Sequence, residues 1–129
     1  MNKVVVDSSV VIAYLRREPG WESLEQHLAG TCLISTVNLT EVIGKLREKG
    51  VDHTTLDSIL DQLGLTVVSF DETQARQAGE LRLVTRHLGL SLGDRACLAL
   101  AGVQGLVAIT TDAAWGQLNS GTNVQVVRR

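Results

Sequence analysis

Near the start of the chain, three β-branched residues, Val4, Val5 and Val6, run directly into the carboxylate of Asp7. A continuous apolar run, in place of an alternating one, is typical of a strand covered on both faces, as in a parallel α/β sheet. Ligands bind such sheets just beyond the carboxyl ends of the strands. Asp7 is therefore predicted to lie at a binding edge, and the fold has to bring other groups to it.

The rest of the chain alternates short apolar runs with helical patterns. Further strands are predicted at residues 31–35, 65–70, 106–109 and 123–127. Helices are predicted at 8–17, 21–28, 36–49, 53–63 and 92–101, after Asp71 to about residue 88, and around Trp115. Strands separated by helices predict an α/β fold, a three-layer α/β/α sandwich with a mostly parallel five-stranded sheet. A chain of 129 residues is expected to form a single domain over 1–129.

Composition excludes several classes of function. Aromatic residues make up 3% of the chain, which argues against base-stacking platforms for nucleic acids. With 14 acids against 12 bases, the net charge of −2 does not by itself predict a polyanion partner, although a local basic patch could still bind one.

Cys32 and Cys97 lie in apolar contexts and are expected in the core of a protein from a reducing compartment. The first apolar run is too short for a signal peptide or membrane span, so a cytoplasmic protein is expected.

Four carboxylates are predicted to meet at the edge that Asp7 occupies. Asp7 and Asp112 each follow a strand, while Glu41 and Asp94 lie in the first turns of helices. Each has an ordinary structural explanation, because Asp7 and Asp112 can cap the helices that follow them. The segments 38–41 and 91–94 also resemble capping boxes, in which an acid three residues after the cap satisfies backbone donors.

The four acids together are harder to explain by capping alone. Like charges brought within a few ångströms raise one another's pKa and destabilise the site. A bound cation relieves that cost, and hard divalent ions prefer carboxylate oxygens together with water and substrate phosphate. The residues therefore predict an Mg²⁺ or Mn²⁺ site, with one or two ions, that acts on a phosphate-bearing substrate.

The segments that carry these acids resemble the four motifs of the PIN-domain family. They read VVVDSSVVIA at 4–13, STVNLTEV at 35–42, LSLGDRACLALA at 90–101 and ITTD at 109–112. Their order and spacing are similar to those of VapC toxins from bacterial and archaeal toxin–antitoxin pairs, over essentially the whole chain. The resemblance implies a metal-dependent endoribonuclease that cuts structured RNA, commonly tRNA or ribosomal RNA. It also implies a homodimer that a cognate VapB-type antitoxin inhibits.

The resemblance also assigns roles to individual residues. Asp7, Glu41, Asp94 and Asp112 match the catalytic acids, with Asp7 and Asp94 expected as direct metal ligands and Asp112 as a ligand directly or through water. Glu41 is expected to bind metal or to orient the attacking water. Ser8 and Thr110 match small hydroxyl positions beside the site. Some relatives carry one more acid just after the fourth motif, but residues 113–119 contain none, which leaves the number of metal ions open.

Basic residues near the acids are candidates for binding RNA phosphates, because phosphate contacts dominate the affinity for nucleic acids. Those candidates are Arg16, Arg17, Lys45 and Arg95. For Lys45, an ordinary helical ion pair with Glu41 is an equal alternative. The apolar stretches 10–15 and 34–43 predict either a groove for an antitoxin helix or extra burial within the monomer.

Two other functions are weighed against the ribonuclease. A receiver-type phosphoacceptor domain would use Asp7, Asp71 and Thr110, but it leaves Glu41 and Asp94 unexplained. The sequence also lacks that domain's second acid after the first strand and its lysine after the fifth. A catalytically silent PIN-fold module that only binds RNA or protein is the remaining alternative, and the intact set of four acids speaks against it.

Overall fold

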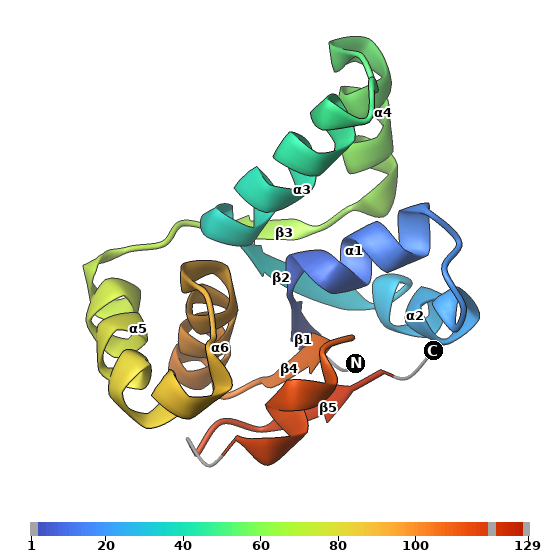
Figure 1. Cartoon of the computed structure of the whole chain (residues 1–129). Helices are drawn as coiled ribbons and strands as arrows, with labels where there is room; N and C mark the ends of the chain where they lie inside the picture. The colour runs from blue at the N-terminus through green and yellow to red at the C-terminus, as the bar shows by residue number, and fades with distance from the viewer. Residues whose placement is uncertain (1–2, 119–120, 128–129) are drawn as a thin grey trace.

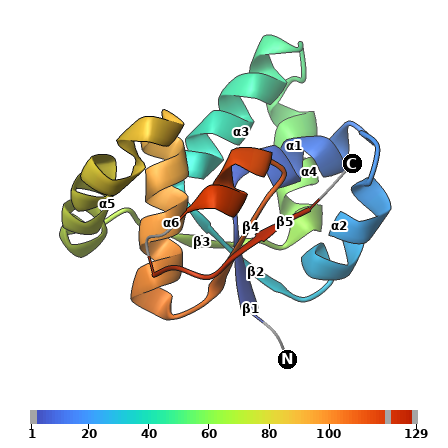
Figure 2. The same cartoon turned by 60° about the horizontal axis from the view of Figure 1, so that its bottom comes forward.

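A five-stranded parallel sheet forms the centre of the molecule, as the sequence predicts. The computed structural model describes residues 3–118 and 121–127, and its strands lie in the order β3-β2-β1-β4-β5 (Figure 2). All four strand pairs are parallel. The bounds are Lys3–Val6 for β1, Thr31–Ser35 for β2, Thr66–Val68 for β3, Val107–Thr110 for β4 and Val124–Val126 for β5.

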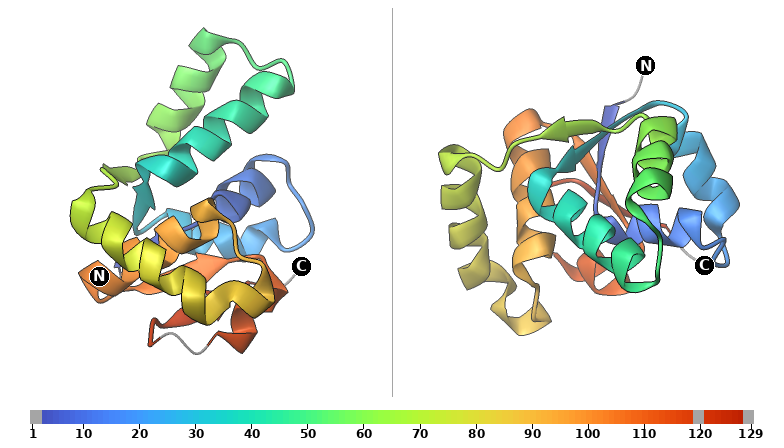
Figure 3. Two further views of the ribbon diagram at one scale, coloured as in Figure 1. Left: turned by 60° about the vertical axis from the view of Figure 1, so that its left-hand side comes forward. Right: turned by 90° about the horizontal axis from the view of Figure 1, so that it is seen from above.

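Helices cover both faces of this sheet (Figure 1). They are α1 (Ser8–Leu15), α2 (Trp21–Leu28), α3 (Thr36–Glu48), α4 (His53–Leu63), α5 (Glu72–Thr85) and α6 (Leu92–Gln104), with the 3₁₀ turns η1 (Arg86–Leu88) and η2 (Ala113–Gln117). Helix α6 packs on one face, with α5 outside it, and α1 and α2 pack on the other. The hairpin of α3 and α4 projects from the body of the molecule (Figure 3).

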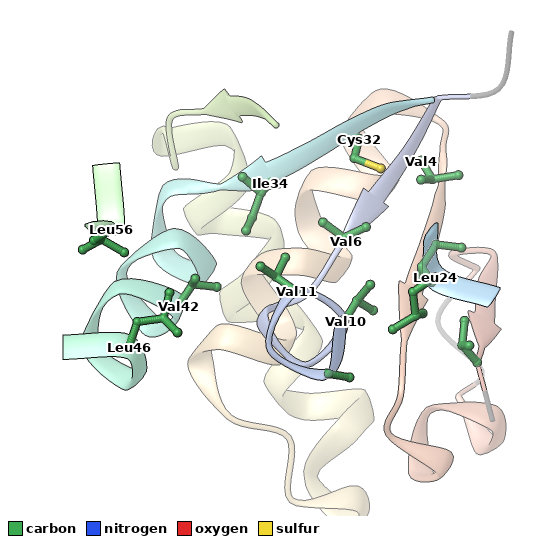
Figure 4. Packing of buried hydrophobic residues seen from close by; sticks show 13 residues of the cluster. Val4, Val6, Val10, Val11, Leu24, Cys32, Ile34, Val42, Leu46 and Leu56 are labelled. Atoms are coloured by element: carbon green, nitrogen blue, oxygen red, sulfur yellow. The ribbon is translucent and has the colours of Figure 1, made fainter. Parts of the chain in front are cut away.

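The continuous valine run of β1 is buried because its side chains belong to two hydrophobic cores, one on each face of the sheet. Val4 and Val6 belong to a cluster with residues of α1, α2 and α3 (Figure 4), whereas Val5 packs with α6 on the opposite face. Most apolar residues of 10–15 and 34–43 belong to the first cluster or pack half-buried against it. Burial within the monomer therefore accounts for part of these stretches, and the groove for an antitoxin helix stays a prediction.

The order of the strands creates a crevice at the carboxyl end of β1. From β1 the chain adds β2 and β3 on one side, and β4 and β5 lie on the other. In open α/β sheets such a reversal leaves room for a ligand between the two neighbouring strand ends. The Asp7 backbone N–H donates to the Ile109 carbonyl across this junction, with 3.2 Å between N and O. Asp7 therefore stands directly at the reversal point.

Several predicted boundaries were wrong by a few residues. The first helix ends at Leu15 because the chain turns at Arg17, which has a φ of 55°. The long helix ends at Thr85 and continues only as a 3₁₀ turn, and the third strand is limited to Thr66–Val68. Within the part of the chain that the structure describes, no helix has both the length and the apolar character needed to cross a membrane.

Candidate active site

Asp7 is a buried carboxylate that the fold holds tightly. Its side chain accepts hydrogen bonds from the Ser9 hydroxyl (2.5 Å), the Thr110 hydroxyl (2.7 Å) and the Val10 backbone N–H (3.2 Å). Burial raises the pKa of Asp7 to about 6 from an ordinary 3.8, with a further contribution from Asp94, while these hydrogen bonds oppose the rise. The Val10 contact makes Asp7 the N-cap of α1, so the structural explanation is also correct. The cap fixes the carboxylate at the crevice.

Ser9 is a site residue that the sequence reasoning missed. The sequence offers two neighbouring hydroxyls, and Ser8 is the one matched to the family motif. In the structure the Ser8 hydroxyl donates to Glu41 at 2.9 Å, whereas the Ser9 hydroxyl bonds Asp7 and also accepts from the Thr111 backbone N–H at 3.1 Å. Ser9 thereby joins the ends of β1 and β4. Only the pairing of those strands shows which hydroxyl faces the crevice.

Thr110 lies where the sequence places it, beside Asp7. Its hydroxyl is fully buried, donates to Asp7 and accepts from the Asp112 backbone N–H at 3.1 Å. The threonine therefore connects the first and fourth motifs directly. Asp112 itself caps η2, with its carboxylate accepting from the Ala114 N–H at 2.9 Å.

Glu41 lies in the second turn of α3 and reaches toward the start of α6. The expected capping box at 38–41 was wrong, because the helix begins at Thr36 and Ser35 is its N-cap. Asn38 is instead inside the helix and donates to Glu41 at 3.1 Å. Gly93 completes this environment, since a Cβ atom at Gly93 would fall on the Glu41 carboxylate. Sequence reasoning assigned neither Asn38 nor Gly93 to the site.

Asp94 is electrostatically the centre of the four acids. Its expected capping box with Ser91 is present, with N–O distances of 2.9 and 3.2 Å. Burial raises the pKa of Asp94, and the negative charges of Asp112 and Glu41 add to that rise. Asp94 in turn contributes to the raised pKa of Asp7. Among residues 3–118 and 121–127, no lysine, arginine or histidine forms an ion pair with any of the four acids.

The chemistry of this donor set suits a hard divalent cation, because mutually repelling carboxylates, two of them with a raised pKa, share one edge. In this structure the four carboxylates accept hydrogen bonds from the protein itself. The donors are Ser9, Thr110, Ser8, Asn38 and backbone N–H groups at the starts of α6 and η2. In the described part of the chain, no three histidine, cysteine, aspartate or glutamate side chains are arranged to hold a metal ion. The donors therefore match the cation in chemical type, but in the described residues they do not form a group of three that could hold it.

Two of the four basic residues expected at the site lie beside it. Arg16 and Lys45 line a cavity of about 520 Å³ together with Ser8, Ser9 and Glu41. Lys45 forms no ion pair with a described residue, so the helical pair with Glu41 is not formed. Arg16 lies 3.9 Å from Glu18, with half of its side chain exposed. Arg16 and Lys45 thus place positive charge in the same cavity as Glu41, where Glu18 adds a second negative charge.

The other two expected basic residues, Arg17 and Arg95, have intramolecular partners. The Arg17 guanidinium stacks on the rings of Trp21 and Tyr14, at 4.0 and 5.6 Å from their centroids. The Arg95 side chain donates to the Ala78 carbonyl at 2.9 Å, which ties α6 to α5. Cation–π stacking and helix packing therefore account for both guanidinium positions, and the structure does not bring them to the cavity beside Glu41.

A second basic cavity lies at the start of α6. It measures about 260 Å³, and its lining includes Arg82, Arg86, Arg95 and Ser91. Ser91 is the N-cap of the helix that carries Asp94. Arg82 lies near the end of α5 and Arg86 begins η1, and both residues are exposed. Positive charge thus also lies near the start of the helix that carries Asp94.

Comparisons with known proteins agree with this architecture. Residues 4–119 match the PIN domain. The chain is similar to a toxin–antitoxin complex from Klebsiella pneumoniae (TM-score 0.74, 16% identity, covering 95% of this chain and 96% of that one). It is also similar to DNA-bound VapBC from Salmonella typhimurium (TM-score 0.74, 19% identity, 98% of each chain).

A third similar structure is that of Mycobacterium tuberculosis VapC20, described as a sarcin-ricin loop cleaving toxin (TM-score 0.66, 16% identity, covering 81% of this chain and 86% of that one). No curated protein sequence matches the chain. The structural similarity establishes a shared fold with these proteins, and the match of residues 4–119 to the PIN domain establishes the family. The chain therefore belongs to the PIN-domain family.

Proposed function

We propose that this protein is a VapC-type endoribonuclease that uses Mg²⁺ or Mn²⁺ to hydrolyse phosphodiester bonds in structured RNA such as tRNA or ribosomal RNA. The observation that carries the proposal is Asp7, a carboxylate buried at the strand reversal whose pKa is raised to about 6. A buried carboxylate without a described ion-pair partner destabilises a fold, so it is expected to serve a site. VapC20, which shares the fold, is described as cleaving the sarcin-ricin loop.

The four acids have separate roles in this proposal. Asp7 and Asp94 would bind the metal directly, Asp112 would bind it directly or through water, and Glu41 would bind metal or orient the attacking water. The bound ion supplies activation of a water nucleophile and stabilisation of charge on the phosphate. Ser9 and Thr110 hold Asp7 in one orientation, and Ser8 holds Glu41. Residues 113–119 add no acid, so the proposal leaves room for one ion or two.

The substrate strand is proposed to cross the acids between the two basic cavities. Arg16 and Lys45 would bind phosphates on the side of α1 and α3, and Arg82 and Arg86 on the side of η1. Arg17 and Arg95 stay candidates for RNA contact, although each guanidinium has an intramolecular partner. The family excludes the receiver-type alternative, because the chain is a PIN-domain protein.

A VapB-type antitoxin is the proposed protein partner, and the active form is proposed to be a cytoplasmic homodimer. The support is that several proteins with this fold were solved as toxin–antitoxin complexes. The α3–α4 hairpin projects from the body of the molecule (Figure 3) and packs on the first core through Val42, Leu46 and Leu56, so that its opposite, exposed side offers a surface for such a partner. Co-expression with the product of a neighbouring small reading frame, followed by size-exclusion chromatography, checks both the partner and the copy number.

Purified protein is expected to cut total cellular RNA into discrete fragments with Mg²⁺ or Mn²⁺, and EDTA is expected to stop the reaction. Asp94→Asn should lose the activity because it removes a proposed metal ligand, whereas Asp61→Asn on the exposed side of α4 should retain it. Gel analysis followed by mapping of the fragment ends measures the result. Absence of cleavage by folded wild-type protein would favour the silent binding module instead.

Lys45→Gln is expected to weaken RNA binding and to lower the dependence of binding on salt by about one unit of slope, because one phosphate contact is lost. Affinity for Mn²⁺ should not change. Lys49→Gln is the matched control, since Lys49 is exposed at the end of the same helix and does not line the cavity. Fluorescence anisotropy of a labelled RNA over a salt series measures both slopes. Equal slopes for the two variants would contradict a role for Lys45.

A further inference from the structure

Asn38 is a buried polar residue within α3 that no cap or core contact explains. Its exposed fraction is 1%, and it lies three residues after the N-cap Ser35. Asparagine is a poor helix former because its side chain competes for backbone groups. The residues around it in the helix, Val37, Leu39 and Val42, are apolar. A leucine would therefore suit this position in both helix propensity and burial.

The Asn38 side chain connects two motifs that are far apart in the sequence. Its Nδ2 donates to Glu41 Oε1 at 3.1 Å and to the Gly93 carbonyl at 2.9 Å, which joins α3 to the first turn of α6. Both partners are acceptors, so the amide must face them with its nitrogen. Gly93 directly precedes Asp94. One side-chain amide thus spans from one acid of the site to the backbone beside another.

The opposite side of the same amide has no partner. Asn38 Oδ1 is buried without a hydrogen bond to any described residue. A buried acceptor that is left unpaired lowers stability, whereas an apolar side chain of the same shape is close to neutral. Asn38 is thus a poor choice for stability alone, and its two donor contacts both lead to the acids.

We propose that Asn38 is a positioning residue that fixes the Glu41 carboxylate relative to Asp94 by holding α3 against the start of α6. This inference rests on the proposed metal-dependent function. Ser8 holds the same Glu41 oxygen from α1 at 2.9 Å, and Gly93 leaves space for the carboxylate. Asn38 is the member of this environment that links Glu41 to the helix that carries Asp94.

The test compares Asn38→Leu with Gln74→Met. Gln74 is a matched control because it is also a buried amide, donates to a backbone carbonyl (Ser69, 3.0 Å) and has an unpaired oxygen, yet it lies at the start of α5. Asn38→Leu should bind Mn²⁺ about 10- to 100-fold more weakly, the range for losing a group that orients a metal ligand. Its thermal midpoint should equal or exceed that of wild type, and kcat for RNA should fall while KM stays constant.

Isothermal titration with Mn²⁺ alone measures the affinity, and Asn38→Ser, which is smaller and keeps a hydroxyl, repeats the comparison if the leucine variant does not fold. Gln74→Met should bind Mn²⁺ like wild type. Unchanged Mn²⁺ affinity in both Asn38 variants would overturn the inference, as would an equal loss in Gln74→Met. Wild-type protein that neither binds Mn²⁺ nor cuts RNA would overturn the proposed function and this inference with it.

Discussion

Asp7→Asn is expected to lower RNA cleavage by about a thousandfold while making the protein more stable at pH 8. The loss follows because an amide is a weaker ligand for a hard cation than a carboxylate. The gain follows because Asp7 is 3% exposed and burial is the largest cause of its raised pKa. An uncharged side chain of the same shape removes the burial of a charge. Function and stability therefore change in opposite directions.

The gain in stability depends on pH in a defined direction. The pKa of Asp7 is about 6 in the folded protein and 3.8 in its ordinary state, so the folded protein holds the proton more tightly between these values. The wild-type free energy of unfolding therefore falls as pH rises from about 4 to 6, by about 3 kcal/mol for a shift of this size. The asparagine side chain of the variant does not titrate, and lost hydrogen bonds reduce its advantage to about 1–3 kcal/mol above pH 7.

Urea unfolding of both proteins at pH 4 and pH 8 measures this difference. Asp71→Asn is the control, because Asp71 is also an N-cap, accepting from the Gln74 N–H, but is exposed and belongs to α5 rather than to the acid cluster. Asparagine caps about as well as aspartate, so this control should keep both activity and stability. An Asp7→Asn protein less stable than wild type at pH 8 would contradict the burial argument.

Gly93→Ala is expected to lower cleavage by about 10- to 100-fold without loss of stability. The added Cβ would overlap the Glu41 carboxylate, which is the end of a flexible side chain and can move away. Alanine is also the better helix former, by up to about 1 kcal/mol. The substitution would displace the Glu41 carboxylate, which would then lose its hydrogen bonds with Ser8 and Asn38.

Gly102→Ala in the same helix is the matched control. Its Cβ would meet neighbouring side-chain atoms at ordinary contact distances of 3.5 Å, and the acids are not among them. This variant should gain the same helix propensity and keep full activity. Thermal unfolding and cleavage rates of the two variants, measured together, separate helix propensity from the position of Glu41. Full activity in Gly93→Ala would show that the position of Glu41 does not limit the reaction.

The fold and the edge that carries the site were predictable from local patterns. An unbroken valine run before Asp7 requires cover on both faces, and parallel strands place their carboxyl ends together. The order of the acids along the chain therefore brought Asp7, Glu41, Asp94 and Asp112 to one edge. The capping box at Ser91 was predictable for the same reason, because it depends on residues three apart.

The roles of side chains that form contacts between different helices and strands were not predictable in this way. The hydrogen bond from Thr110 to Asp7 spans 103 residues, and that from Asn38 to Gly93 spans 55. Arg17 and Arg95 show the same limit, because aromatic rings and a carbonyl of another helix hold their guanidinium groups. Spacing places a residue on an element, but it does not show which rotamer the neighbouring element selects.

The sequence by itself thus determined the parallel sheet, the acids at the strand ends and the family. Hydrophobic periodicity depends on a few neighbouring residues, and the order of the motifs can be read directly along the chain. Tertiary structure decided that Ser9 binds Asp7, that Gly93 makes room for Glu41, and that Asn38 joins the two helices. Those contacts depend on how side chains from distant segments pack within a few ångströms. Packing at that scale is set by the whole core and not by any one stretch of the chain.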